Sequence, residues 1–315
     1  MLTYVEGDLF TSPADVLVNT VNTVGVMGKG IAKEFKDIYP EMFRDYQKLC
    51  ESGDLTIGRL FLYKTPNKWI LNFPTKRHWR QKSRLAYIEA GLKTFVAGYP
   101  EKRISSIAFP QLGCGNGELD WEGQVRPLME RHLGNLPIEI FIHIYTHGSL
   151  LPEHRDRQQM KAWLHSEPNS LAFSEVWDDL LCLIGGTPDH GWRVLRDEND
   201  EAVAIKTSGP TGEETLPKED LFDLWQRLRT FGFLAKDDLP KVYEAIAPRL
   251  LDLIESLPYI ESARFITKTN GALSPASTQD LLRADTSEGI RLVPPLQKRE
   301  VAKTPLLRLE GTGVE

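Results

Sequence analysis

The sequence predicts an α/β fold for the first half of the chain, and two strand–loop–helix units are the observations that predict it. Residues 16–21 form an almost continuous apolar and largely β-branched run, typical of an interior strand covered on both faces. A glycine-rich loop follows at residues 25–30, and apolar residues then recur at helical spacing. The same order returns as a strand at 104–109, a glycine-rich loop at 113–117 and a helix at 121–132.

The remaining segments alternate in the same way up to a change of pattern at residues 166–170. Before that point we expect strands at 2–5, 59–63, 69–73 and 138–145, and helices at 31–38, 41–50, 83–96 and 150–163. After it we expect helices at 173–184, 218–231 and 239–257, and a hairpin of 192–196 with 202–206. The chain therefore divides into a first domain (1–155), a helical connection and linker (156–170) and a smaller α+β domain (171–315), less regular after about residue 267.

Charge and cysteine content narrow the class of protein. Residues 1–165 carry 21 Lys and Arg against 18 Asp and Glu, and residues 166–315 carry 17 against 26, so the net charges are +3 and −9. The halves are thus suited to different partners. Three widely separated cysteines give neither a disulfide framework nor a zinc spacing. With no basic leader and no long apolar run, we expect a cytoplasmic protein without a membrane partner.

The two glycine loops predict a site for an anionic ligand. Glycines let the backbone run close to a ligand, and the free amides at the start of the following helix favour negative charge. Asn19 and Asn22 at the end of the first strand add the donors and acceptors that read sugar hydroxyls. The first loop fits neither a P-loop nor a dinucleotide fingerprint, and a tight strand-to-helix turn is its alternative. Two matched loops can hold a diphosphate from both sides.

Three other features carry an open alternative. Asp8 stands after the first strand and suits either an adenine amino group or a turn cap. The loop at 74–82 mixes cations with aromatic residues, so it is either a site for a nucleic-acid strand, with Trp79 as a stacking face, or a solvated loop. Cys114 is interpreted as a small residue between glycines rather than a nucleophile. The histidines show no ligand spacing, and we expect no metal.

Taken together, Asp8, the Asn19–Asn22 strand end and the two glycine loops resemble a macrodomain over about residues 1–155. The resemblance implies a three-layer α/β/α sandwich with a mixed central sheet. Within that family the first loop, the stretch from Asn72 to Trp79 and the second loop resemble the DarG antitoxins, which are DNA ADP-ribosyl glycohydrolases. Such antitoxins act against a DarT-like toxin that ADP-ribosylates thymidine in single-stranded DNA.

The resemblance assigns roles to residues of this sequence. It implies catalysis by Lys76 and Asn22, no cofactor, and ADP-ribose as the product ligand. The DNA contacts that we expect come from the cations and aromatic residues of the 74–82 loop and are Arg77, His78, Trp79 and Arg80. The implied ADP-ribose contacts are Asp8, Leu9, Asn19, Thr20, Gly25, Val26, Met27, Gly28, Lys29, Gly30, Gly113, Cys114, Gly115, Asn116, Gly117 and Glu118.

The chemistry implied is cleavage of the bond at the anomeric carbon of the distal ribose. Our hypothesis is that Lys76, partly neutral if Arg77, Arg80 and Lys82 lie close, attacks that carbon or its ring-opened form. In the alternative, Lys76 only pairs with phosphate. Related glycohydrolases that act on protein carboxylates place an aspartate after the second loop, whereas this chain has Gly117 there, with Glu118 and Asp120 as the nearby acids. The other functions that fit are a non-catalytic ADP-ribose reader and a hydrolase of protein-linked ADP-ribose.

The second half has no catalytic constellation. Its acidic groups could occupy the DNA-binding cleft of the toxin, which the resemblance implies, or simply keep the surface soluble. They lie at Asp178–Asp179, Asp197–Glu201, Glu213–Glu214, Glu219–Asp220 and Asp237–Asp238.

Overall fold

The computed structural model describes residues 1–145, 152–186, 191–197, 200–207, 212–266 and 286–293. The chain divides into two compact units, of which the first holds Met1–Leu164 with Leu171–Val176 and the second holds His165–Ser170 with Trp177–Glu315. The segment Leu171–Val176 follows the stretch that the sequence predicts as a linker, yet it belongs to the first unit. No described helix has the length and apolar character needed to cross a membrane.

A six-stranded mixed sheet is the centre of the first unit. Its order is β1-β6-β5-β2-β4-β3, and every neighbouring pair is parallel except β3 with β4 at one edge. The strands are β1 (Leu2–Glu6), β2 (Val16–Val21), β3 (Phe61–Lys64), β4 (Trp69–Pro74), β5 (Ser106–Pro110) and β6 (Glu139–Ile144). The central position of β2 between β4 and β5 confirms what its continuous apolar run predicts.

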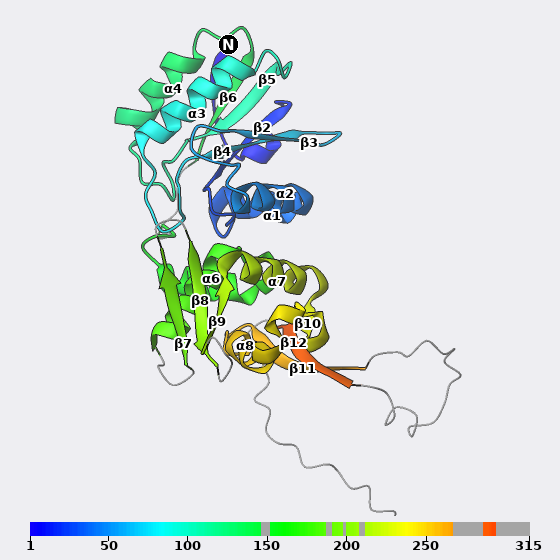
Figure 1. Ribbon diagram of the computed structural model, residues 1–315. Coiled ribbons are helices and arrows are strands. Elements are labelled where there is room, and N and C mark those ends of the chain that lie inside the picture. The colour runs from blue at the N-terminus through cyan, green and yellow to red at the C-terminus, as the bar shows by residue number, and fades with distance from the viewer. Residues whose placement is uncertain (146–151, 187–190, 198–199, 208–211, 267–285, 294–315) are drawn as a thin grey trace, which may run out of the picture. The chain divides into compact units, whose positions relative to one another are not determined.

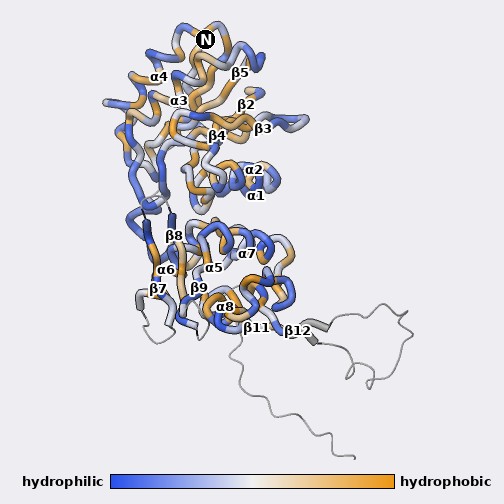
Figure 2. Tube along the Cα trace, in the orientation of Figure 1, coloured by the Kyte–Doolittle hydropathy of each residue, from blue (hydrophilic) through white to orange (hydrophobic). Residues whose placement is uncertain are grey.

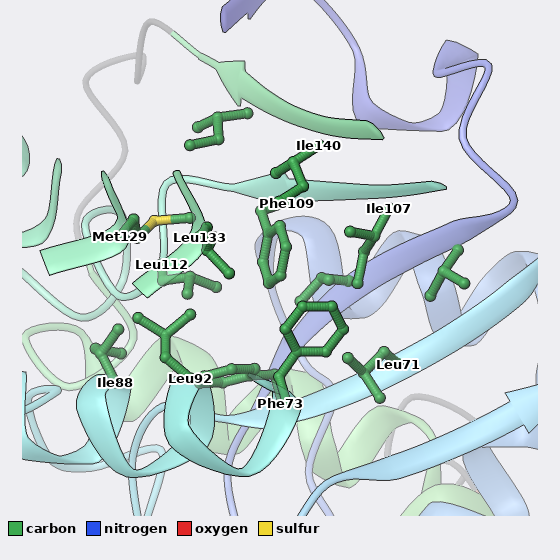
Figure 3. Packing of buried hydrophobic residues seen from close by; sticks show 14 of the residues in the cluster. Leu71, Phe73, Ile88, Leu92, Ile107, Phe109, Leu112, Met129, Leu133 and Ile140 are labelled. Atoms are coloured by element: carbon green, nitrogen blue, oxygen red, sulfur yellow. The ribbon is translucent and has the colours of Figure 1, made fainter. Parts of the chain in front are cut away.

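Helices cover both faces of this sheet and complete three layers (Figure 1). One face carries α1 (Gly30–Ile38) and α2 (Pro40–Glu51), whose Phe35 and Tyr46 join one buried core. The other carries α3 (Leu85–Gly98) and α4 (Arg126–Leu133). There Ile88 and Leu92 pack against Phe73 and Phe109 of the sheet (Figure 3). The predicted α/β/α sandwich is confirmed. Apolar residues occur along β4 and β5 (Figure 2), as expected for strands that lie between other strands of the sheet.

The second unit contains two small antiparallel sheets and their helices. The first sheet orders β7 (Trp192–Arg196), β8 (Glu201–Lys206) and β9 (Glu213–Pro217), and the second orders β10 (Phe233–Ala235), β12 (Thr286–Leu292) and β11 (Ile260–Ile266). The helices are α5 (Arg157–Ser166) and α6 (Phe173–Gly186), which also contribute to the first unit, α7 (Lys218–Phe231) and α8 (Ala247–Glu255). Across both units, short helical turns lie at Leu9–Thr11, Trp121–Val125, Pro168–Ser170, Lys236–Asp238 and Lys241–Ile246.

Two predicted helices begin later than the sequence pattern suggests. The helix predicted at 150–163 begins at Arg157, because Asp156 Oδ1 accepts the amide of Gln159 and caps it there, and positions 150–151 lie outside the described residues. The helix predicted at 239–257 is a 3-10 turn followed by α8, which starts next to Pro248. The second sheet was not predicted, since its strands pair across long stretches of sequence.

A buried polar cluster links the segments of the second unit. Asp179 Oδ2 lies 2.8 Å from His165 Nε2 and accepts a hydrogen bond of 3.1 Å from the Tyr259 hydroxyl. Asp179 is therefore a structural residue of the interior and not part of an acidic surface, which corrects the interpretation of the Asp178–Asp179 pair.

Candidate functional site

The first glycine loop is held in shape by the side chain of Asn22. Its Oδ1 accepts from the amides of Val24 (3.0 Å) and Val26 (3.3 Å) and from the Tyr46 hydroxyl (3.0 Å), and its Nδ2 donates to Val26 O (2.6 Å). Asn22 is buried and fixes the loop that would hold a ligand, and its expected contact with the ribose stays a prediction. Gly25 and Gly30 have φ values of 77° and 58°, which favour glycine.

The second glycine loop is equally constrained. A Cβ on Gly117 would lie 2.2 Å from Ser83 Oγ and 2.3 Å from the backbone oxygen of Gly113, so this position accepts only glycine in this arrangement. Gly113 has a φ of 72°, and its oxygen accepts from the amide of Leu119 (3.0 Å). A Cβ on Gly30 would lie 3.0 Å from Asn116 Nδ2, so the two loops approach each other at these residues.

Lys76 lies where these loops meet. The chain beyond β4 continues beside the end of β2, because the amide of Thr75 donates to Val21 O (2.9 Å) and that of Thr23 donates to Arg77 O (3.2 Å). From this extension Lys76 Nζ donates to Asn116 O (3.1 Å) in the second loop. The structure therefore brings together the lysine and both loops, which are separate in sequence.

A carboxylate that the sequence did not suggest faces this lysine. Glu153 Oε2 lies 3.3 Å from Lys76 Nζ, and both side chains are 8% exposed. Burial raises the pKa of the Glu153 carboxyl, against the opposing effect of Lys76. Arg80 and Lys82, which we expected to act on Lys76, instead pair with Glu175 (2.5 Å) and Glu118 (2.6 Å). The charge nearest to the amine is thus negative, which corrects that expectation.

The segment that carries Glu153 also packs on the first loop. Met160 and Trp163 of α5 lie so near Gly28 that a Cβ there would be 2.0 Å from Met160 Cε and 2.8 Å from the Trp163 ring. Lys36 Nζ of α1 lies 5.0 Å from the centroid of the Trp163 ring. Local sequence carries no signal for these contacts, because 77 positions separate Lys76 from Glu153.

The basic loop differs most from its prediction. Trp79 is 1% exposed, and its Nε1 donates to Glu175 Oε1 (2.9 Å), so its ring is no stacking face for a base. Arg80 binds the same carboxylate, and His78 is partly buried with its pKa lowered to about 4, first by burial and then by Arg80. Of the four expected DNA contacts only Arg77 is exposed.

Another aromatic residue stands among exposed cations. The guanidinium carbons of Arg77 and Arg84 lie 5.9 and 5.6 Å from the centroid of the Tyr87 ring, and both arginines are exposed. Sequence reasoning missed Tyr87 because it belongs to the apolar pattern of α3. Its position one turn after Arg84 is the signal that could have found it.

Several side chains that we expected to contact the ligand make hydrogen bonds or packing contacts within the protein. Asp8 Oδ1 accepts the amide of Phe10 (2.9 Å), which is the capping alternative, and its contact with adenine stays a prediction. Asn19 is fully buried and donates to Asn72 Oδ1 (2.9 Å), which joins β2 to β4, and its contact with ADP-ribose stays a prediction. The side chains of Leu9, Val26 and Met27 lie in the core, which leaves only their backbone for a ligand.

The remaining predicted residues lie along the two loops. Thr20, Lys29, Gly115 and Asn116 are partly buried, and Gly28 is buried. Burial raises the pKa of the Cys114 thiol to about 12, as a structural role requires. Glu118 has a φ of 58° and binds Lys82 and His154. Among the described residues no group of three or more His, Cys, Asp or Glu side chains is arranged to hold a metal ion.

Comparison with known proteins gives a consistent match. Residues 18–127 match the model of the Macro domain family. A curated relative from Mycobacterium tuberculosis, named DNA ADP-ribosyl glycohydrolase, is 55% identical over 126 residues, which are 39% of this chain and 36% of the relative. A relative from Thermosipho africanus, named a DNA ADP-ribosyl transferase–DNA ADP-ribosyl glycohydrolase fusion protein, is 40% identical over 162 residues, which are 45% of this chain and 42% of the relative.

One solved structure is similar to part of this chain. The macrodomain of Mycobacterium tuberculosis DarG is 49% identical, covers 47% of this chain and 99% of its own length, and superposes with a TM-score of 0.44. The match spans less than half of the length of these curated relatives.

Proposed function

Since the first unit of this chain is a macrodomain, we propose that the protein is a hydrolase that removes ADP-ribose from thymidine bases of single-stranded DNA. The observation that carries this proposal is the buried amine of Lys76 at the meeting point of two glycine loops. A protein that only binds ADP-ribose needs no amine there. The relatives named DNA ADP-ribosyl glycohydrolase support the choice of substrate.

In this proposal the glycine loops bind and Lys76 reacts. Backbone amides of both loops hold the pyrophosphate, with the N-terminus of α1 adding favourable dipole charge. The distal ribose then lies next to Lys76, whose Nζ attacks the anomeric carbon while the bond to the base breaks. Asn22 contributes by keeping the first loop in shape. No cofactor takes part in these steps.

The modified strand needs a contact surface of its own. We place it at Arg77, Arg84 and Tyr87, where two exposed cations flank an aromatic ring. Cations neutralise phosphates and the ring offers a face to an unstacked base. This replaces Trp79, whose ring is buried, as the candidate stacking residue.

The second unit suits a role as the toxin-binding part of an antitoxin. Its exposed carboxylates include Asp178, Asp197, Asp200, Glu219 and Asp237. Elsewhere in the unit Glu213 pairs with Arg193 and Asp238 with Arg227. Exposed carboxylates can take the places of phosphates in a DNA-binding cleft. The Thermosipho africanus relative, which joins a transferase to a glycohydrolase, supports a transferase as the partner.

Two substrates offered side by side test the enzymatic part. The chain and its Lys76→Ala variant are given an oligonucleotide ADP-ribosylated on thymidine and a peptide ADP-ribosylated on glutamate. We expect release of ADP-ribose from the oligonucleotide by the parental chain only. Binding of free ADP-ribose should persist in Lys76→Ala. Undiminished turnover by the variant, or preference for the peptide, would contradict the proposal.

A cell-protection assay tests the partner. Lys76→Ala abolishes hydrolysis in this proposal, so any remaining protection against the transferase must come from binding. We expect partial protection by the Lys76→Ala chain and its loss when Glu219 and Asp237 are also changed to lysine. Equal protection with and without these charge reversals would contradict the toxin-binding role.

A further inference from the structure

The acids that the sequence offers near the second loop are committed elsewhere. Glu118 lies 2.6 Å from Lys82 Nζ and 3.1 Å from His154 Nε2, and Arg155 binds it as well. The hydrogen bond from Lys82 is the main cause that lowers the pKa of Glu118, so this carboxyl has no proton to give near neutral pH. Asp120 Oδ2 accepts the amide of Gly123 (3.2 Å) and caps the turn before α4.

Glu153 is differently placed. Its Oε2 lies 3.3 Å from Lys76 Nζ, and the side chains of both residues are buried. The charged and titratable groups that act on it are Lys76, Lys29, His154 and the Tyr46 hydroxyl. Burial raises the pKa of this carboxyl, and the neighbouring cations, Lys76 first, oppose that effect.

We propose that Glu153 is the residue that exchanges protons with Lys76 and with the departing base in the hydrolysis. The inference rests on the proposed function and adds to it the acid that this reaction requires. The inference rests on the 3.3 Å distance between Glu153 Oε2 and Lys76 Nζ, which places the carboxyl within hydrogen-bond reach of the attacking amine. Negative charge on a leaving base needs a proton donor at the same place.

Protons balance through the two halves of the reaction. The Glu153 carboxylate first takes a proton from the Lys76 ammonium, which leaves an amine and a carboxylic acid. The amine lone pair then forms a bond to the anomeric carbon, and the bond from that carbon to the thymine nitrogen breaks. Its electron pair leaves with the base, which takes the proton of Glu153.

Water completes the cycle. Its oxygen forms a bond to the anomeric carbon as the bond to Lys76 Nζ breaks, and the electron pair of that bond returns to the nitrogen. Glu153 takes the proton that the water loses and passes it to Nζ. The ammonium and the carboxylate are restored, and the products are free ADP-ribose and unmodified thymine in the strand.

The test replaces the carboxyl and then supplies it from solution. In the full-length chain, Glu153→Gln should lower turnover of the ADP-ribosylated oligonucleotide by about 100-fold or more. Its dissociation constant for ADP-ribose should stay within a few-fold of the parental value. Sodium formate should restore part of the turnover of Glu153→Ala, an effect that a purely structural role would not produce. Glu89→Gln, at a partly exposed carboxylate paired with Lys93, is the matched control and should behave as the parental chain.

The possible results separate the two levels of the proposal. Turnover by Glu153→Gln equal to or above the parental rate would overturn the role of Glu153, since the carboxylate would then only cover the amine. No rescue of a folded Glu153→Ala variant by formate, with circular dichroism as the check of folding, would also count against it. If the parental chain does not turn over the oligonucleotide, the proposed function is overturned and this step with it. If Lys76→Ala turns it over fully, Lys76 is not the attacking group and has no proton to exchange with Glu153.

Discussion

Removing the carboxyl of Glu175 should destabilise the first unit strongly, because this residue explains why Trp79 is buried. Glu175 is 2% exposed, accepts from Trp79 Nε1 at 2.9 Å and lies 2.5 Å from Arg80 Nη2. Breaking one side of a buried ion pair typically costs about 3–5 kcal/mol. Arg80 retains some exposure to solvent, so we expect the free energy of unfolding of Glu175→Ala to fall by about 2–4 kcal/mol.

Urea unfolding followed by tryptophan fluorescence measures this change. With a denaturant dependence of about 2 kcal/mol per molar urea, the transition of the first unit should move down by about 1–2 M. Glu89→Ala is the matched control, since its ion pair with Lys93 (2.9 Å) lies at the solvent-accessible surface of α3 and should contribute little to stability. A shift for Glu175→Ala no larger than that of the control would refute the structural role.

Trp79→Phe separates the two interpretations of the same loop. The substitution keeps an aromatic ring but removes the N–H that binds Glu175 and part of the buried indole, so stability should fall by at least about 1–2 kcal/mol. Affinity for a single-stranded oligonucleotide should not change. A weaker oligonucleotide complex with unchanged stability would instead favour a stacking role for this ring.

Three further outcomes follow from the loops and the basic surface. Gly117→Ala should weaken ADP-ribose binding in a calorimetric titration, because its Cβ would lie 2.3 Å from the backbone oxygen of Gly113 and the loop must shift; an unchanged affinity would contradict this. Changing Tyr87 and Arg84 to alanine should weaken oligonucleotide binding and reduce the slope of log K against log salt by about 0.7, with ADP-ribose binding unaffected. His78 has a pKa of about 4 in the folded chain, lowered first by burial, so the unfolded chain binds more protons below its ordinary value of 6.5. Stability should therefore fall between pH 6.5 and 4, less steeply in His78→Asn, and identical pH profiles would refute that cause.

Much of the fold could be predicted because it depends on local pattern. The apolar run at Val16–Val21 gave β2 its bounds, and the helical spacing at Lys218–Phe231 gave α7 its bounds. Both elements bury residues at a period that the sequence displays directly. The small sheet of β10, β11 and β12 has no such signal, because its strands are held by pairing across distant segments.

The candidate site shows the same division. Glycine spacing marked both loops, since glycine is needed where the backbone takes a positive φ or approaches other atoms closely. The partners Glu153 and Glu175 could not be predicted, because each meets its cation or tryptophan across 77 to 96 residues. Basic residues next to an aromatic one look alike in sequence whether the ring is exposed or, as for Trp79, covered by a distant carboxylate.

The central claim is that Lys76 lies beside the anomeric carbon when both glycine loops hold one pyrophosphate. A crystal structure of this chain with ADP-ribose measures this directly. We predict the pyrophosphate between the loops and the Lys76 Nζ within about 3.5 Å of the anomeric carbon of the distal ribose, which is the separation of a reactive pair. ADP-ribose bound elsewhere, or an Nζ turned away from that carbon, would contradict the account.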